Sequence, residues 1–158
     1  MLIYGGYSSP FTVHHSLTMN TFEELEAWKV AREFRIYISE LIVTFPSHER
    51  YKLCDQITRS VRSVGNNIAE GFGRYHFQEN IQYCRQARGS LHETLDHLII
   101  ALDEKYIDQE KFNHSKLLFA KNLKILNGYI NYLQKAKSQS SGAKNYLTDL
   151  DIEYGLKN

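Results

Sequence analysis

The chain has 158 residues, 42% of them hydrophobic, a length that suits one domain whose core needs no disulfide or metal. Its 19 Lys and Arg residues nearly balance its 18 Asp and Glu residues, which excludes a strongly charged molecule. No apolar run is long enough to cross a membrane, and residues 1–18 contain no Lys or Arg to begin a secretory signal. We therefore expect a cytoplasmic protein.

The first 18 residues carry no charge and show no periodic pattern, so we expect residues 1–18 to be a disordered or extended start. A first helix follows, with Thr21 as the N-cap of a capping box completed by Glu24. Its apolar residues recur at alternating spacings of four and three, as in a bundle helix. They are Ala27, Ala31, Phe34, Ile38, Leu41 and Phe45. Pro46 ends this helix, because the residue before a proline avoids helical backbone angles.

The first helix has more apolar surface than one bundle needs. Five apolar residues lie outside its main apolar stripe: Trp28, Val30, Ile36, Tyr37 and Ile42. A helix that is apolar on more than one side is usually buried on more than one side. This surplus predicts a second interface, between copies of the chain.

A second helix is expected from the Ser47 cap to Gly71, with Gly71 and Gly73 ending it in a left-handed C-cap. Gly65 lies in mid-helix, where glycine costs about 1 kcal/mol relative to alanine. Cys54 and, in the next helix, Cys84 fall at apolar positions and are interpreted as buried free thiols.

The third helix should span Phe77–Asp103, without a good cap, and Asp108 should cap a fourth. Residues 138–142 read as a flexible linker, which makes 138–158 a flexible acidic tail after a bundle of residues 19–137. Four long helices joined by short loops predict an all-α fold, an antiparallel up-down four-helix bundle.

The pattern favours a protein without catalytic residues, metal or cofactor. His92 and His97 are five residues apart, whereas a zinc-protease helix places its two histidines four apart. The inward positions carry no paired Glu-x-x-His for a di-iron site. One enzymatic alternative stays open, a helical ribonuclease that would use Arg85 and His92, seven residues apart on one helix face.

A row of basic residues is the strongest indication of a ligand. Flexible cations grip the phosphates of RNA or DNA without reading sequence. The row consists of Lys52, Arg59, Arg62, Arg85 and Arg88. The alternative is a solvated face on a purely structural interaction module.

The end of the second helix has the most unusual residues in the chain. Asn66 and Asn67 are poor helix formers, so we expect one of them to bond a neighbouring helix or subunit. Glu70 and Arg74 are spaced to form an ion pair that steadies the C-cap. The extended motif comprises Phe45-Pro46, Glu49-Arg50-Tyr51, Leu53, Gln56, Arg59, Ser63, Asn66-Asn67-Ile68-Ala69-Glu70-Gly71 and Gly73-Arg74.

From about Phe22 to Tyr132, the chain resembles the four-helix-bundle proteins encoded in intervening sequences of bacterial large-subunit ribosomal RNA genes. That family also resembles the accessory variability determinants of diversity-generating retroelements. The resemblance implies a homo-oligomer, a pentameric ring with a positively charged surface, and a nucleic-acid partner. It also implies a possible protein partner such as a reverse transcriptase. Relatives usually carry proline where this chain has Gly65.

Overall fold

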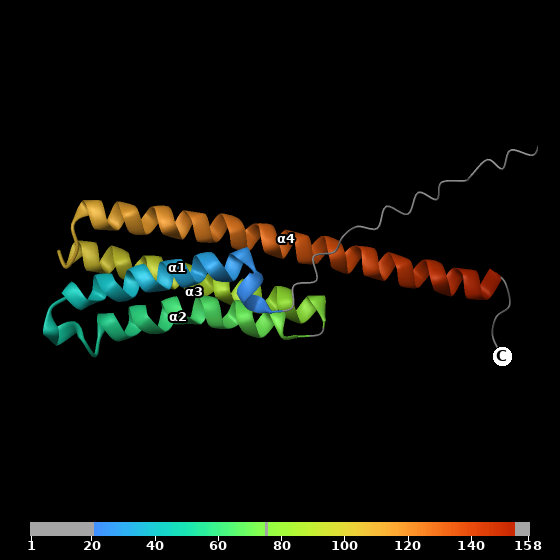
Figure 1. Ribbon diagram of the computed structural model, residues 1–158, viewed down its shortest axis with the longest axis horizontal. Helices are drawn as coiled ribbons and strands as arrows, with labels where there is room; N and C mark the ends of the chain where they lie inside the picture. Colours follow the sequence, from blue (N-terminus) through green and yellow to red (C-terminus); the bar gives the residue numbers. More distant parts are fainter. Residues whose placement is uncertain (1–20, 75, 154–158) are drawn as a thin grey trace, which may run out of the picture.

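The computed structural model describes residues 21–74 and 76–153, with side chains as far as residue 141. Within these residues the chain forms four α-helices and no strand, which confirms the all-α class (Figure 1). The helices are α1 (Glu26–Leu41), α2 (Leu53–Phe72), α3 (Phe77–Asp103) and α4 (Gln109–Glu153). Three 3-10 turns accompany them: η1 (Phe22–Glu24), η2 (Ile42–Thr44) and η3 (Ser47–Glu49). The predicted disordered start, residues 1–18, lies outside the described residues.

The four helices pack side by side around one core. α1 contacts α2 and α4, and α3 contacts α2 and α4, so each helix has two helical neighbours (Figure 1). The predicted apolar stripe of α1 is buried throughout. The largest fully buried side chains are those of Phe34, Ile38, Ile57, Ile68, Leu91, Leu98 and Leu126.

The start of the first helix differs from the predicted capping box. The Thr21 hydroxyl accepts a 3.5 Å hydrogen bond from the Glu23 N–H at the start of η1. Glu24 belongs to that turn, and α1 begins only after Leu25, which provides no side-chain cap. The inserted turn separates the two box residues from the helix that they were expected to cap. The α-helix ends at Leu41, earlier than predicted, and the 3-10 turn η2 continues to Thr44 before Phe45, next to Pro46, becomes extended with ψ 155°.

Four of the five surplus apolar residues of the first helix are packed within the chain: Val30 is buried, and Trp28, Tyr37 and Ile42 are half-buried against the core. Trp28 meets Phe22 edge-on, with ring centroids 5.1 Å apart. The Tyr37 ring lies 4.7 Å from that of His114, and its hydroxyl donates to the Lys111 carbonyl of α4 at 3.3 Å. Only Ile36 stays exposed, at 38%. The surplus is therefore smaller than the sequence pattern indicated, because η1 and α4 cover part of it.

Both ends of α2 differ from prediction. Ser47 begins the turn η3, and the carboxylate of Glu49 caps α2 by accepting from the Leu53 N–H at 3.2 Å. At the other end the helix includes Gly71, and Gly73 follows it with φ −71°, a right-handed conformation. The predicted left-handed glycine cap is wrong, because the Arg74 N–H closes a right-handed turn onto the Gly71 carbonyl at 3.2 Å.

α3 has the predicted bounds and, as expected, no side-chain cap at His76. A turn with Lys105 in the left-handed region, at φ 61°, leads to α4. The Asp108 carboxylate accepts from the Lys111 N–H at 2.8 Å, which confirms the predicted cap.

α4 continues through residues 138–142 and extends beyond the other three helices, in contrast to the predicted linker (Figure 1). Two serine hydroxyls of this segment donate to carbonyls of the preceding turn, an arrangement that serine adopts inside helices. Ser138 donates to the Gln134 carbonyl at 3.1 Å, and Ser141 to the Lys137 carbonyl at 3.0 Å. The boundary predicted after residue 137 thus falls inside a helix. Over residues 21–74 and 76–153, no helix has both the length and the apolar character needed to cross a bilayer.

Candidate nucleic-acid interface

The five basic residues of the predicted row do not share one surface. Lys52, the N-cap residue before α2, and Arg59, within α2, are exposed, and Arg59 is paired with Asp55 at 3.6 Å. Arg62 lines a cavity between α1 and α2. On α3, Arg85 lines a groove toward α4, and the Arg88 guanidinium donates to the Asn127 side chain of α4 at 3.1 Å. The basic side chains of the two helices therefore have different neighbours: Arg62 of α2 lies beside α1, whereas Arg85 and Arg88 of α3 lie beside α4.

The cavity between α1 and α2 has a volume of about 220 Å³. It is lined by Trp28, Ala31, Arg32, Arg35, Arg62, Gly65 and Asn66. Sequence reasoning missed Arg32 and Arg35. A signal was present: neither has an acidic residue three or four positions away to pair with on the helix.

The groove between α3 and α4 is larger, about 560 Å³, and more polar in its lining. Arg85 and Lys137 contribute positive charge from the two helices. The Lys137 ammonium donates to the Gln78 side chain at 2.7 Å. Both basic regions therefore lie between helices, one on each side of the α2–α3 pair.

The motif residues Glu70, Gly71 and Arg74 build the junction between α2 and α3. The Arg74 guanidinium donates to the Glu70 carboxylate and to the Tyr83 hydroxyl, each at 2.7 Å, and lies 5.0 Å from the Tyr83 ring centroid. The hydrogen bond from Arg74, with a smaller contribution from Tyr83, lowers the pKa of Glu70. The predicted ion pair is confirmed, and it reaches across to α3.

Gly71 is required by close packing. A Cβ at this position would lie 2.8 Å from Asn80 Oδ1 and 2.9 Å from the Tyr83 Cβ, distances that real Cβ atoms do not adopt. Asn80 itself is held in place, since its amide donates to the Tyr129 hydroxyl at 3.0 Å. The absent side chain lets α3 approach α2.

The two asparagines of the motif have different surroundings. Asn66 is exposed at the rim of the α1–α2 cavity. The Asn67 amide donates to the Ser63 carbonyl at 2.8 Å and to its hydroxyl at 2.9 Å, both within α2. We expected an asparagine of this pair to bond a neighbouring helix, but Asn67 bonds Ser63 of its own helix. The contact with α3 is made by Ser63 instead, whose hydroxyl accepts from that of Ser90.

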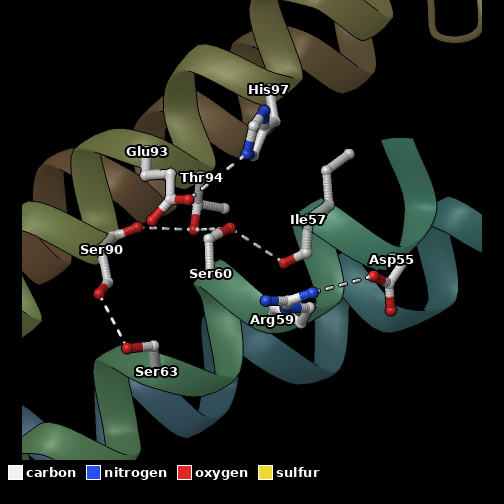
Figure 2. Close-up of polar contacts among 9 residues, drawn as sticks. All are labelled: Asp55, Ile57, Arg59, Ser60, Ser63, Ser90, Glu93, Thr94 and His97. Carbon is white, nitrogen blue, oxygen red and sulfur yellow. Dashed lines mark hydrogen bonds and ion pairs between the residues drawn. The ribbon is translucent and has the colours of Figure 1, made fainter. Parts of the chain in front are cut away.

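A polar seam joins α2 to α3 (Figure 2). We use this name for Ser60, Ser63, Ser90 and Thr94. The Ser90 hydroxyl donates to the Ser63 hydroxyl at 2.9 Å, and the Thr94 hydroxyl lies 2.9 Å from both the Ser60 hydroxyl and the Ser90 carbonyl. Ser60 in turn donates to the Ile57 carbonyl at 3.1 Å. Each buried hydroxyl thus has a partner, as buried polar groups require.

His97 lies beside this seam (Figure 2). Both of its ring nitrogens are shielded from solvent, and neither has a hydrogen-bond partner among the described residues. The Glu93 carboxylate is 3.8 Å from Nε2, an ion-pair distance only when the ring is protonated.

Nothing in the described residues indicates catalytic chemistry. His92 packs edge-on against Phe119 at 5.2 Å, whereas Arg85, about 10 Å away along the helix axis, lines the groove with Lys137. Burial raises the pKa of the Cys84 thiol to about 12 and also raises that of Cys54, so neither is a ready nucleophile. No three His, Cys, Asp or Glu residues of the described part are grouped to hold a metal.

The described residues thus form an all-α protein in which Glu70, Gly71 and Arg74 join the second helix to the third. The model of the 23S rRNA-intervening sequence protein family matches residues 23–128, more than half of the chain, so the chain belongs to that family. This confirms the resemblance derived from the sequence.

The structure is also similar to a crystal structure from Bacteroides thetaiotaomicron, described as a protein of unknown function from the S23 ribosomal protein family. The two are 22% identical with a TM-score of 0.59, and the match covers 66% of this chain and 97% of the other. At this identity the similarity concerns the fold alone. No curated protein matches the chain.

Proposed function

We propose that this chain is a non-enzymatic, oligomeric scaffold that binds nucleic acid in the cytoplasm. The proposed assembly is a pentameric ring whose subunits are antiparallel up-down bundles. The observation that carries the proposal is the pair of basic regions between helices, in a family named for intervening sequences of 23S rRNA. A protein partner such as a reverse transcriptase belongs to the same proposal.

The chemistry of these regions supports backbone contact rather than base reading. Arg62 and Arg85 are exposed, and neither forms an ion pair within the described residues. Guanidinium groups bind phosphate oxygens through two parallel hydrogen bonds. Each neutralised phosphate releases condensed counterions, so affinity should fall steeply with salt. Repetition of the regions around a ring would raise avidity without any new contact.

The experiment combines light scattering after size exclusion with binding of labelled RNA and DNA at several salt concentrations. We expect an oligomer that binds both at low salt. Arg62→Gln with Arg85→Gln should weaken binding and reduce the salt slope by about 1 to 2, the range for one or two lost phosphate contacts.

Lys121→Gln is the matched control, since Lys121 is exposed but already paired with Glu33 at 2.7 Å. It should leave the salt slope unchanged. A monomer at micromolar concentration would contradict the ring. Absence of binding at low salt would contradict the nucleic-acid function and favour a structural interaction module.

A further inference from the structure

The cavity between α1 and α2 gathers three guanidinium groups without a counter-charge. Arg32 and Arg35 come from α1 and Arg62 from α2. None of the three side chains forms an ion pair or a hydrogen bond within residues 21–74 and 76–141. Other charged side chains of the same two helices do find partners: Arg59 pairs with Asp55, and Glu33 pairs with Lys121.

This lack of partners is encoded in the sequence. Helix neighbours lie three and four positions apart. At these positions around Arg32, Arg35 and Arg62 the chain has Trp28, Lys29, Ala31, Ile36, Ile38, Ser39, Thr58, Arg59, Gly65 and Asn66, together with the arginines themselves. There is no acid among them. Like charges that line one cavity repel one another, so the site favours a bound anion.

The size and the donors of the cavity restrict that anion. A volume of about 220 Å³ is below the roughly 300 Å³ at which pockets begin to enclose drug-sized ligands. The lining offers guanidinium groups, the Asn66 amide and the Trp28 indole N–H, which is a donor only. Gly65 keeps the α2 side of the cavity open, since the nearest atom to a Cβ there is Trp28 Nε1 at 3.7 Å.

We propose that this cavity is a binding site for a single phosphate group, held by Arg32, Arg35 and Arg62. A planar guanidinium donates two parallel hydrogen bonds to the oxygens of one phosphate group. The group could be supplied by a nucleic-acid backbone or by free phosphate. The backbone as its source rests on the proposed function, whereas the site itself does not.

The chain has one tryptophan, Trp28, and it lines the cavity, so its fluorescence reports directly on occupancy. The full chain is titrated with inorganic phosphate at constant ionic strength, with chloride as the reference. We expect a saturable change in Trp28 fluorescence with phosphate and none with chloride.

The variant Arg32→Gln with Arg35→Gln should weaken phosphate binding by about tenfold or more, because hydrogen bonds to charged groups are among the stronger ones. Arg59→Gln is the matched control and should bind phosphate as the parent does, since Arg59 lies one turn from Arg62 but is paired with Asp55. Thermal melting of each variant verifies that the fold is retained.

Two outcomes overturn the site: a phosphate response no larger than that of chloride, or the same response in the Arg32 and Arg35 variant. Either leaves the proposed function standing if the parent still binds RNA or DNA. A saturable response that oligonucleotide competes away supports the site with the backbone as its source. A response untouched by oligonucleotide supports the site with free phosphate as its ligand.

Discussion

The helix α2 has two contrasting sides. Toward α3, the hydroxyls of Ser60 and Ser63 are hydrogen-bonded to residues of α3. On the same side Gly71 packs closely against Asn80 and Tyr83. Toward α1, Arg62 has no partner among the described residues, and Gly65 leaves a cavity. The family motif thus lies mostly on the side that holds the bundle together. The groups available to a ligand lie on the other side, where the motif contributes Asn66 to the cavity lining but none of its three arginines.

The largest expected effect comes from breaking the α3 side. Gly71→Ala places a Cβ against Asn80 and Tyr83 at distances that force the helices apart. Overpacking of this kind costs about 1–3 kcal/mol, and the better helix propensity of alanine offsets up to about 1 kcal/mol. We expect a net loss of about 2 kcal/mol in the free energy of unfolding, measured by urea denaturation.

Gly89→Ala provides the comparison, since a Cβ at this mid-helix position of α3 meets nothing within 4 Å. It should stabilise the protein by about 0.5–1 kcal/mol. Equal losses for the two variants would mean that close packing is not what Gly71 provides.

The polar seam should give the next largest effect. Thr94→Val keeps the shape of the side chain but removes the hydroxyl that bonds to Ser60 and to the Ser90 carbonyl. We expect a loss of about 1–2 kcal/mol, because the Ser90 carbonyl and Ser60 lose a buried partner. Ser39→Ala, which removes an exposed 2.7 Å bond to the Arg35 carbonyl, should change stability by less than about 0.5 kcal/mol. A Thr94→Val variant as stable as the parent would mean that the hydrogen bonds of the polar seam do not stabilise the fold.

The smallest effect concerns the exposed Glu70–Arg74 pair. The Arg74 hydrogen bond lowers the pKa of Glu70 in the folded state. The pair therefore contributes stability above the pKa of Glu70 in the unfolded chain, and this is lost as pH falls through the lower folded value. The melting temperature of Glu70→Gln should be slightly below that of the parent at neutral pH, and the difference should vanish in acid. A difference that persists unchanged at low pH would have another origin.

The sequence predicted the elements whose signals are local. The apolar spacing in Phe77–Asp103 and the Asp108 cap depend on neighbours along the helix, and both are confirmed. The role of Gly71 was missed because it depends on Asn80 and Tyr83 across the interface. A glycine near a helix end is usually a left-handed cap, and only the approach of α3 distinguishes the two cases.

The candidate site shows the same limit. The spacing of Arg59 and Arg62 on α2 placed them in one predicted row. In the structure Arg59 pairs with Asp55 on the helix surface, whereas Arg62 lines a cavity because α1 packs beside it. Arg32 and Arg35 were visible only as arginines with no acid three or four positions away on the helix. The cavity that joins them to Arg62 depends on the packing of α1 against α2, which no local pattern specifies.

The seam also has a consequence for the order in which the bundle assembles. Its Ser63–Ser90 contact closes a loop of 27 residues, whereas the Tyr37–Lys111 contact between α1 and α4 closes one of 74. The entropy lost on loop closure grows with the logarithm of loop length, so the longer closure costs about 0.9 kcal/mol more at room temperature. Chain entropy thus favours the docking of α2 against α3 before α1 closes onto α4.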